Sequence, residues 1–157
     1  LRGMLFWLMG DLSQTGDPQL VLILLVVALL TTLPFARELN LLARGADIAQ
    51  ALGVAVGPLR RGVYVMASLA TAAAVTHAGA IGFIGLIVPH LVRLAAGNDQ
   101  RLLLPASVLA GGSLLVIADT LARSVLAPQQ LPVGVLTALI GVPVFLFLLS
   151  RAAPGRH

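Results

Sequence analysis

The sequence predicts an all-α membrane protein, a polytopic helical bundle, and three observations support this fold class. Hydrophobic residues make up 59% of the 157 residues, charged residues only 10%, and the mean hydropathy is +1.01. Several apolar runs approach the roughly 20 residues that a helix needs to cross a hydrocarbon core about 30 Å thick. The alternation of apolar and polar residues that is typical of half-buried strands is absent.

The first segment, residues 1–19, predicts a short interfacial helix and a polar connector on the periplasmic side. "LRGMLFWLMG" is apolar but too short to span, and "GDLSQTGDPQ" is rich in turn-forming residues. The chain starts at Leu1 without a start methionine or a signal-peptide pattern. We therefore expect the sequence to be the C-terminal fragment of a longer protein.

Five apolar runs follow, and each predicts a transmembrane helix within a single transmembrane domain that covers residues 1–157. The runs cover residues 20–36, 63–78, 81–97, 102–126 and 133–150. Run 63–78 is rich in small residues, which let neighbouring helices approach closely. An odd number of spans places the two ends of this segment on opposite sides of the membrane.

The third run is interrupted by residues that are unusual in an apolar helix. Six of them are expected to shape its architecture: Gly79, Gly82, Gly85, Pro89, His90 and Arg93. The glycines predict close backbone contacts, and Pro89 predicts a bend because it cannot donate to the carbonyl of Gly85. We expect His90 to be neutral and hydrogen-bonded to a neighbouring helix, and Arg93 to reach the headgroups or pair within the bundle.

All ten basic residues are arginines, and their distribution predicts the orientation. One side of the predicted spans receives Arg37, Arg44, Arg60, Arg61, Arg93, Arg101, Arg151 and Arg156. The other side receives Arg2 and Arg123. Positively charged loops stay in the cytoplasm, so the first group marks the cytoplasmic side of a bacterial inner membrane, with a cytoplasmic C-terminus. The scatter of the arginines between apolar runs argues against nucleic-acid binding.

The longest cytoplasmic connection, residues 37–62, predicts a short amphipathic helix. Asp47 and Gln50 have the spacing of a capping box, Ile48 and Leu52 supply an apolar face, and Gly53 is placed to end the helix.

A second short helix is predicted where Pro58 follows Gly57, because proline is tolerated in a first helical turn. An exposed apolar face on such a helix pair suits the docking of a partner. The residues alone leave the alternative of a helix lying among the lipid headgroups.

Three strings carry a family resemblance: "AGAIGFIGLIVPHLVRL", "LLPASVLAGGSLLVIADTLAR" and "LPVGVLTALIGVPVFLFLL". Together with the preceding "GADIAQALGV", they resemble the C-terminal half of permease subunits of the FecCD type, from ABC importers for iron-siderophores, haem and cobalamin. The resemblance implies a ten-helix permease, of which five transmembrane helices are present here. It also implies a dimer with two ATPase subunits and a substrate-binding protein that delivers the cargo.

The resemblance also implies roles for individual residues. The ATPase-coupling residues would be Gly45, Asp47, Ile48, Leu52 and Gly53. Arg123 would meet a carboxylate of the binding protein at the outer face, which is compatible with an ion pair to Asp119 four residues earlier. The residues that line the pathway would be Gly134, Gly141 and Pro143 in the last helix, which the residues alone identify only as closely packed.

Residues for chemistry are sparse, so we expect no catalytic site, cofactor or metal on this chain. It has no cysteine and no lysine for a phosphate-binding loop, and its serines and histidines lack catalytic or ligand spacing. ATP and Mg²⁺ would then bind to the partner ATPase. The other expected partners are a second permease subunit, identical or closely related, a periplasmic or lipid-anchored binding protein, and membrane lipid.

Two other function classes stay open at this stage. In a proton-coupled secondary transporter, His90 and Asp119 would relay protons and Pro89 would mark a broken helix. A purely structural membrane protein would tolerate changes in the loop from Gly45 to Gly53. Cargo is not specified by the residues, and the resemblance places iron-siderophore first, then haem and cobalamin.

Overall fold

The computed structural model describes residues 10, 12, 18–125 and 133–152, and this part of the chain is helical without strands. The predicted segment 1–19 therefore lies almost entirely outside the described residues. The elements are α2 (Pro18–Thr32), the 3-10 helix η1 (Leu33–Phe35), α3 (Ala36–Leu42), α4 (Ala46–Ala51), α5 (Val56–Ala78), α6 (Ile84–Ala96), α7 (Gln100–Val125) and α8 (Val133–Ala152). This architecture agrees with the predicted all-α membrane fold.

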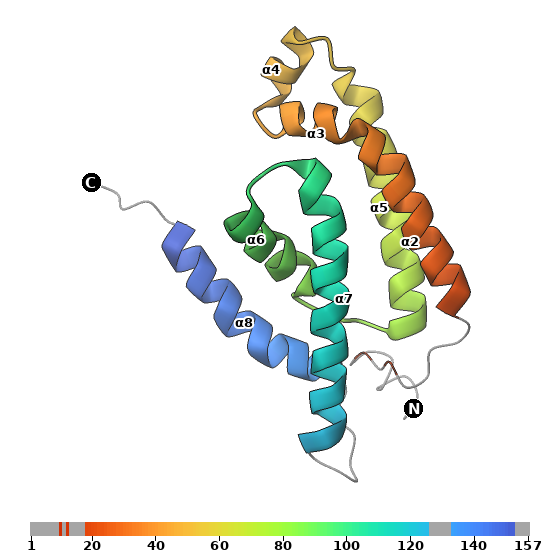
Figure 1. Ribbon diagram of the computed structural model, residues 1–157, viewed down its shortest axis with the longest axis vertical. Coiled ribbons are helices and arrows are strands. Elements are labelled where there is room, and N and C mark those ends of the chain that lie inside the picture. Colours follow the sequence, from red (N-terminus) through yellow and green to blue (C-terminus); the bar gives the residue numbers. More distant parts are fainter. Residues whose placement is uncertain (1–9, 11, 13–17, 126–132, 153–157) are drawn as a thin grey trace.

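The helices form two groups that meet at one end of the molecule (Figure 1). The first group is the pair α2 and α5, which run side by side, and the second is α6, α7 and α8, each in contact with the other two. The short helices α3 and α4 lie at the end where α2 is followed by η1, and α3 also contacts α7. This contact joins the two groups.

Two stretches among the described residues have the length and hydropathy to cross a bilayer. They are Gln19–Leu42, with 24 residues and a mean hydropathy of 2.4, and Gln100–Ser124, with 25 residues and a mean hydropathy of 1.9. The first contains the predicted run 20–36, in which Pro34 lies in η1 instead of in the α-helix. The second matches the predicted run 102–126.

Helix α5 is longer than its predicted span. The prediction placed a separate short helix at Pro58 and a span at 63–78, but one 23-residue helix runs from Val56 to Ala78. Pro58 falls in its first turn, where the missing N–H has no intrahelical partner to lose. Nothing breaks the helix before Gly79, whose φ of 72° ends it. Part of the predicted 37–62 loop is thus the start of α5.

Helix α6 is shorter than its predicted span of 81–97. It has 13 residues, which rise about 20 Å and fall short of a hydrocarbon core of about 30 Å. The cause lies in the preceding backbone, because Phe83 has a left-handed φ of 67° and the Ile84 N–H donates to the Gly82 carbonyl at 2.9 Å. The apolar residues before Ile84 therefore form a turn instead of another helical turn.

The interior of this segment is small, and much of its apolar surface is exposed. Its fully buried residues are mostly small or β-branched, such as Ala36, Ala122 and Val133. Leu109 and Leu139, for example, are 72% and 69% exposed. Apolar helices of a membrane protein show such surfaces to lipid or to other parts of an assembly. Hydroxyls on these helices bond to their own backbone, as Thr120 does to the Val116 carbonyl at 2.7 Å.

Candidate functional site at the coupling loop

Helix α4 is a short helix held between two glycines. Gly45 precedes it with φ 126° and ψ 145°, a backbone conformation that other residues rarely adopt. Gly53 ends it with φ 84°, where the Gly53 N–H donates to the Gln50 carbonyl and the Val54 N–H to the Ala49 carbonyl, both at 2.9 Å. This is the Schellman pattern, and it confirms the predicted end at Gly53.

The predicted cap at Asp47 is wrong. The N-cap residue is Gly45, no side chain caps the helix, and Asp47 lies within the first turn. The glycine backbone turns the chain directly from α3 into α4, so the helix begins one residue before Asp47. A carboxylate in the first turn still interacts favourably with the positive end of the helix dipole.

The predicted apolar face of α4 is present and exposed. Ile48 and Leu52 are 50% and 61% exposed, whereas Ala49 is fully buried and anchors the helix. Gln50 lies on the opposite face from Ile48, two residues or about 200° further around the helix. A helix this short with two large apolar side chains in solvent has a surface that suits a protein partner.

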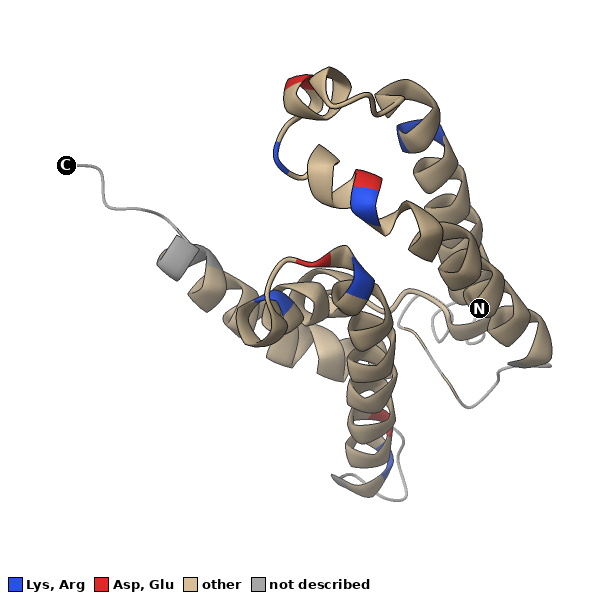
Figure 2. Ribbon diagram, turned by 45° about the horizontal axis from the view of Figure 1, so that its top comes forward, with Lys and Arg blue, Asp and Glu red and all other residues tan. Residues whose placement is uncertain are grey.

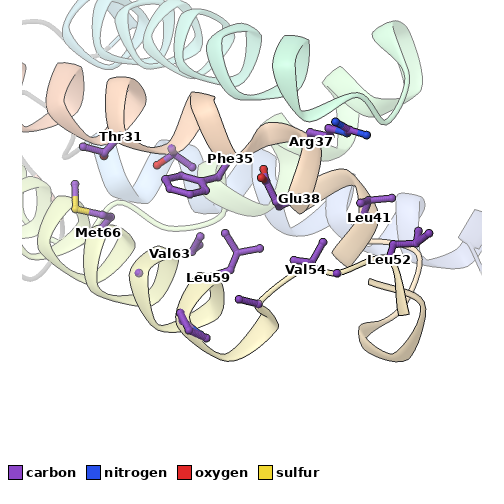
Figure 3. A pocket seen from close by; sticks show the side chains of 15 residues that line it. Thr31, Phe35, Arg37, Glu38, Leu41, Leu52, Val54, Leu59, Val63 and Met66 are labelled. Atoms are coloured by element: carbon purple, nitrogen blue, oxygen red, sulfur yellow. The ribbon is translucent and has the colours of Figure 1, made fainter. Parts of the chain in front are cut away.

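A cavity of about 590 Å³ lies beside this loop (Figure 3). Its walls come from the ends of α2 and η1, from α3, from the turn after α4 and from the start of α5. Most of the lining is apolar, and Leu52 and Gly53 contribute to it. Glu38 lies beside Phe35 in this wall, and its Oε2 is buried without a hydrogen-bond partner among the described residues. Sequence reasoning missed Glu38, because only the fold shows where its carboxylate lies.

Charged residues gather at the end of the molecule that carries α3, α4 and the start of α5 (Figure 2). The α6–α7 connection lies at the same end, because the Asn40 Nδ2 donates to the Asp99 Oδ1 at 2.9 Å and the Gln100 N–H donates to the Asn40 Oδ1 at 2.9 Å. The hydrogen bond from Asn40 and one from the Arg101 N–H hold the pKa of the Asp99 carboxyl below its usual value. The two connections whose arginines were assigned to the same, cytoplasmic side, 37–62 and the one between α6 and α7, are therefore in contact in the structure.

Arg123 lies at the far end of α7, about 33 Å from Arg101 at the helical rise of 1.5 Å per residue. Its Nε donates to the Asp119 Oδ2 at 2.7 Å, the ion pair predicted from the spacing. The two side chains are 42% and 25% exposed, so this pair contributes little to stability. A second, small group of charges is visible there near the end of α7 (Figure 2).

The residues predicted to shape the third span have different roles in the structure. A Cβ on Gly82 or Gly85 would meet nothing within 4 Å, so the predicted close contacts are not made there by the described residues. Gly79 instead ends α5. His90 is half-buried in α6, and its predicted hydrogen bond to a neighbouring helix is not found in the described part of the chain.

Close contact occurs instead at Gly141 in α8. A Cβ there would lie 2.6 Å from the Cβ of Phe83 and 3.3 Å from the Cδ1 of Ile87. Gly141 and Gly134 are buried, so the structure gives them a packing role against their neighbours. Pro143 is exposed, and its place along a pathway stays a prediction.

With this geometry described, the chain can be compared with known proteins. Residues 1–151 match the FecCD transport family. The chain belongs to the FecCD transport family. Within it, the chain is 50% identical over 151 residues to the cobalamin import system permease BtuC of Halobacterium salinarum, covering 95% of this chain and 40% of that protein.

Two more members of the FecCD family carry other cargo names. The hemin transport permease HmuU of Yersinia pestis is 44% identical, over 99% of this chain and 47% of its own length. The Fe(3+) dicitrate transport permease FecD of Escherichia coli is 44% identical, over 94% of this chain and 47% of its own length. The chain thus spans less than half the length of these curated relatives.

A solved structure shares the fold of this FecCD family member. It is an inward-facing conformation of a metal-chelate type ABC transporter, which superposes with a TM-score of 0.87 at 34% identity, over 96% of this chain and 51% of that one. The resemblance inferred from the three strings is therefore confirmed at the level of family and fold, and the helices described here correspond to part of a larger ABC permease.

Proposed function

We propose that this chain is part of the permease subunit of a binding-protein-dependent ABC importer, driven by ATP hydrolysis in a separate subunit. The observation that carries the proposal is α4, a short helix fixed by Gly45 and Gly53 that holds Ile48 and Leu52 exposed. In this proposal, the five coupling residues predicted from the sequence contact the ATPase, which also holds ATP and Mg²⁺.

The cavity beside α4 supports a partner at this position. A buried carboxylate oxygen without a donor costs free energy, and Glu38 has such an oxygen within the described residues. A donor from a subunit that covers the coupling loop, or from the part of a longer chain that precedes Leu1, would satisfy it. The mostly apolar wall around it would accept the nonpolar part of the same segment.

At the opposite end, we propose that Arg123 contacts a carboxylate of the substrate-binding protein. Its pairing with Asp119 holds the guanidinium in place, and the side chain is 42% exposed at the far end of α7. The positions of the arginines favour a cytoplasmic membrane with α4 and the C-terminus in the cytoplasm. A second permease subunit, identical or closely related, would complete the pathway, with Pro143 as a lining residue.

The proposed cargo class is a metal chelate. Relatives of this chain are named for cobalamin, hemin and ferric dicitrate, and its structural neighbour for metal chelates. We place iron-siderophore first and haem or cobalamin second. The chain needs no metal ligands for such a cargo, since the chelator already occupies the coordination sphere of the metal.

The geometry does not favour the alternative of a proton relay. Gly111 of α7 lies level with Val88 of α6, whose Cγ1 is 3.9 Å from the position of a Cβ on Gly111. His90 is two residues beyond Val88 toward the coupling end, and Asp119 is eight residues beyond Gly111 in the opposite direction. They are therefore separated by about 15 Å along the helix axes, too far for direct proton transfer.

The test of the proposal is the variant Leu52→Arg in the full-length permease, co-expressed with its ATPase. A charge in place of an exposed apolar anchor should reduce the ATPase that co-purifies by about tenfold or more. Gln50→Arg is the matched control, because it adds the same charge to the opposite face of α4. We expect this control to retain the ATPase.

Undiminished co-purification of the Leu52→Arg variant would show that α4 is not the ATPase contact. Equal losses in both variants would point to a general effect of charge on the loop. Membrane insertion, measured by the amount of permease in washed membranes, should be the same for both variants and the parent protein.

A further inference from the structure

A second cavity, of about 700 Å³, lies at the same end of the molecule but on another set of elements. It is formed by the end of α3, by the turn into α4 and by the connection between α6 and α7. We call it the α3–α6 cleft, and its lining residues are Asn40, Ala43, Arg44, Arg93, Asn98, Asp99 and Gln100. Neither the coupling residues nor the Arg123 site lies in it.

Hydrogen bonds join the two walls of the α3–α6 cleft. Asn40 joins α3 to the α6–α7 connection through its bonds to Asp99 and Gln100, both at 2.9 Å. The Arg101 N–H also donates to the Asp99 Oδ1 at 3.0 Å. Because both partners of Asn40 lie about 60 residues away in sequence, these bonds fix two distant segments relative to one another.

The charge of the cleft is positive. Arg44 and Arg93 both line it, both are exposed, and neither takes part in an ion pair within the described part of the chain. Asp99 is the one acidic residue in the lining, and its Oδ1 already accepts N–H bonds from Asn40 and Arg101. The described lining therefore carries two positive charges and one negative charge, and the N–H groups of the two guanidinium groups can donate to an anion.

The wall of the cleft indicates what kind of anion fits. Ala43 is the one apolar residue among the described residues that line it, in contrast to the cavity beside α4 with its many apolar side chains. A lipid headgroup brings acyl chains, which need an apolar surface next to the charged site. A carboxylate on a protein needs only donors, and arginine binds carboxylates through two parallel hydrogen bonds.

The position of Arg44 indicates which protein reaches the cleft. Arg44 directly precedes Gly45, and a Cβ on Gly45 would lie 3.9 Å from the Cδ1 of Ile48, so this cleft residue is a close neighbour of the exposed apolar side chain on α4. We propose that the α3–α6 cleft is a second contact for the ATPase, in which Arg44 and Arg93 receive an acidic segment of that subunit. This inference rests on the proposed function, because it assumes that the ATPase sits on α4.

The experiment compares the affinity of purified ATPase for the full-length permease in nanodiscs. The double variant Arg44→Glu/Arg93→Glu should weaken binding about tenfold at low salt and much less at high salt, since the contact is electrostatic. Arg60→Glu is the matched control, an exposed arginine at the same end that lines neither cavity. We expect it to stay within about twofold of the parent protein.

A folding defect is separated from a lost contact by two further measurements. The milder variant Arg44→Gln/Arg93→Gln should elute as the parent does in size-exclusion chromatography and still bind more weakly. Reversing the charge of the acidic segment in the ATPase should restore binding to the Arg44→Glu/Arg93→Glu permease. Restoration would support the direct contact.

Three outcomes would overturn the inference. If the loss occurs only in nanodiscs that contain anionic lipid, the cleft binds a headgroup instead of the ATPase. If affinity is unchanged in the cleft variants while Leu52→Arg still abolishes binding, the inference fails and the proposed function stands. If neither Leu52→Arg nor the cleft variants alter binding, the ATPase does not dock at this end, and both fail.

Discussion

Gly141 is the position where a single methyl group should do the most damage. A Cβ there would lie 2.6 Å from the Cβ of Phe83, and that atom cannot move without a shift of the main chain to which it is bonded. We expect Gly141→Ala to destabilise the protein by about 1–3 kcal/mol, the usual cost of overpacking. Thermal unfolding in detergent measures this change.

The control for this prediction is Gly112→Ala, since a Cβ on Gly112 meets nothing within 4 Å. Replacing a helical glycine in open space should be neutral or stabilise by up to about 1 kcal/mol. Equal unfolding midpoints for the two variants would mean that α8 does not pack against Phe83 as described.

The structural role of a glycine could be predicted from the sequence only where that role depends on neighbouring residues in the chain. Gly53 was predicted to end α4, because a helix end depends on the few residues around it. Gly82 and Gly85 were predicted as contact points and make no such contact with the part of the chain that the structure describes, while Gly141 lies against Phe83. A contact between helices depends on which faces meet, and hydropathy does not carry that information.

At the scale of elements, the sequence predicted where apolar helices lie better than where they end. Long apolar runs correspond to α2, α7 and α8, since each is a continuous stretch without a strong break. The helices differ from the predicted spans in the start of α5 and in the length of α6. Helix α5 starts early because Pro58 is tolerated in its first turn. Helix α6 starts late because Phe83, directly before it, has a left-handed backbone conformation. The hydrogen bond from Asn40 to Asp99 was not predicted either, since the two residues are far apart in the chain.

The hydrogen bonds of Asp99 predict that the stability of the fold depends on pH. The pKa of Asp99 is lowered by its hydrogen bonds, so its charge stabilises the fold above the usual aspartate value of about 3.9. This stabilisation is lost as the pH falls through the lowered pKa. Asp99→Asn, which keeps the shape of the side chain, should therefore unfold at a lower temperature than the parent at pH 7. The difference should shrink below about pH 4, and a constant difference in unfolding midpoint across this range would contradict the assignment.

On the scale of the whole molecule, the described helices correspond to about half of the chain of the solved neighbour. The chain spans 51% of the solved neighbour, and its stretches with span-like hydropathy are only 6% and 11% buried. The exposed apolar surface therefore leaves room for the rest of a permease and for lipid. The separation of the two charged ends along α7 fits a subunit that contacts one partner on each side of a membrane.

The proposed function also makes a prediction about the energy source of transport. Because His90 and Asp119 are about 15 Å apart along the helices, no direct proton relay joins them. In right-side-out vesicles that contain ATP, the full-length permease and the ATPase, with a loaded binding protein outside, we expect His90→Gln to keep uptake within about twofold of the parent. Replacing the phosphate-binding lysine of the ATPase should abolish uptake, whereas a protonophore should leave it unchanged. Uptake that persists without ATP hydrolysis and collapses with the protonophore would instead establish a proton-coupled transporter and remove the role assigned to α4.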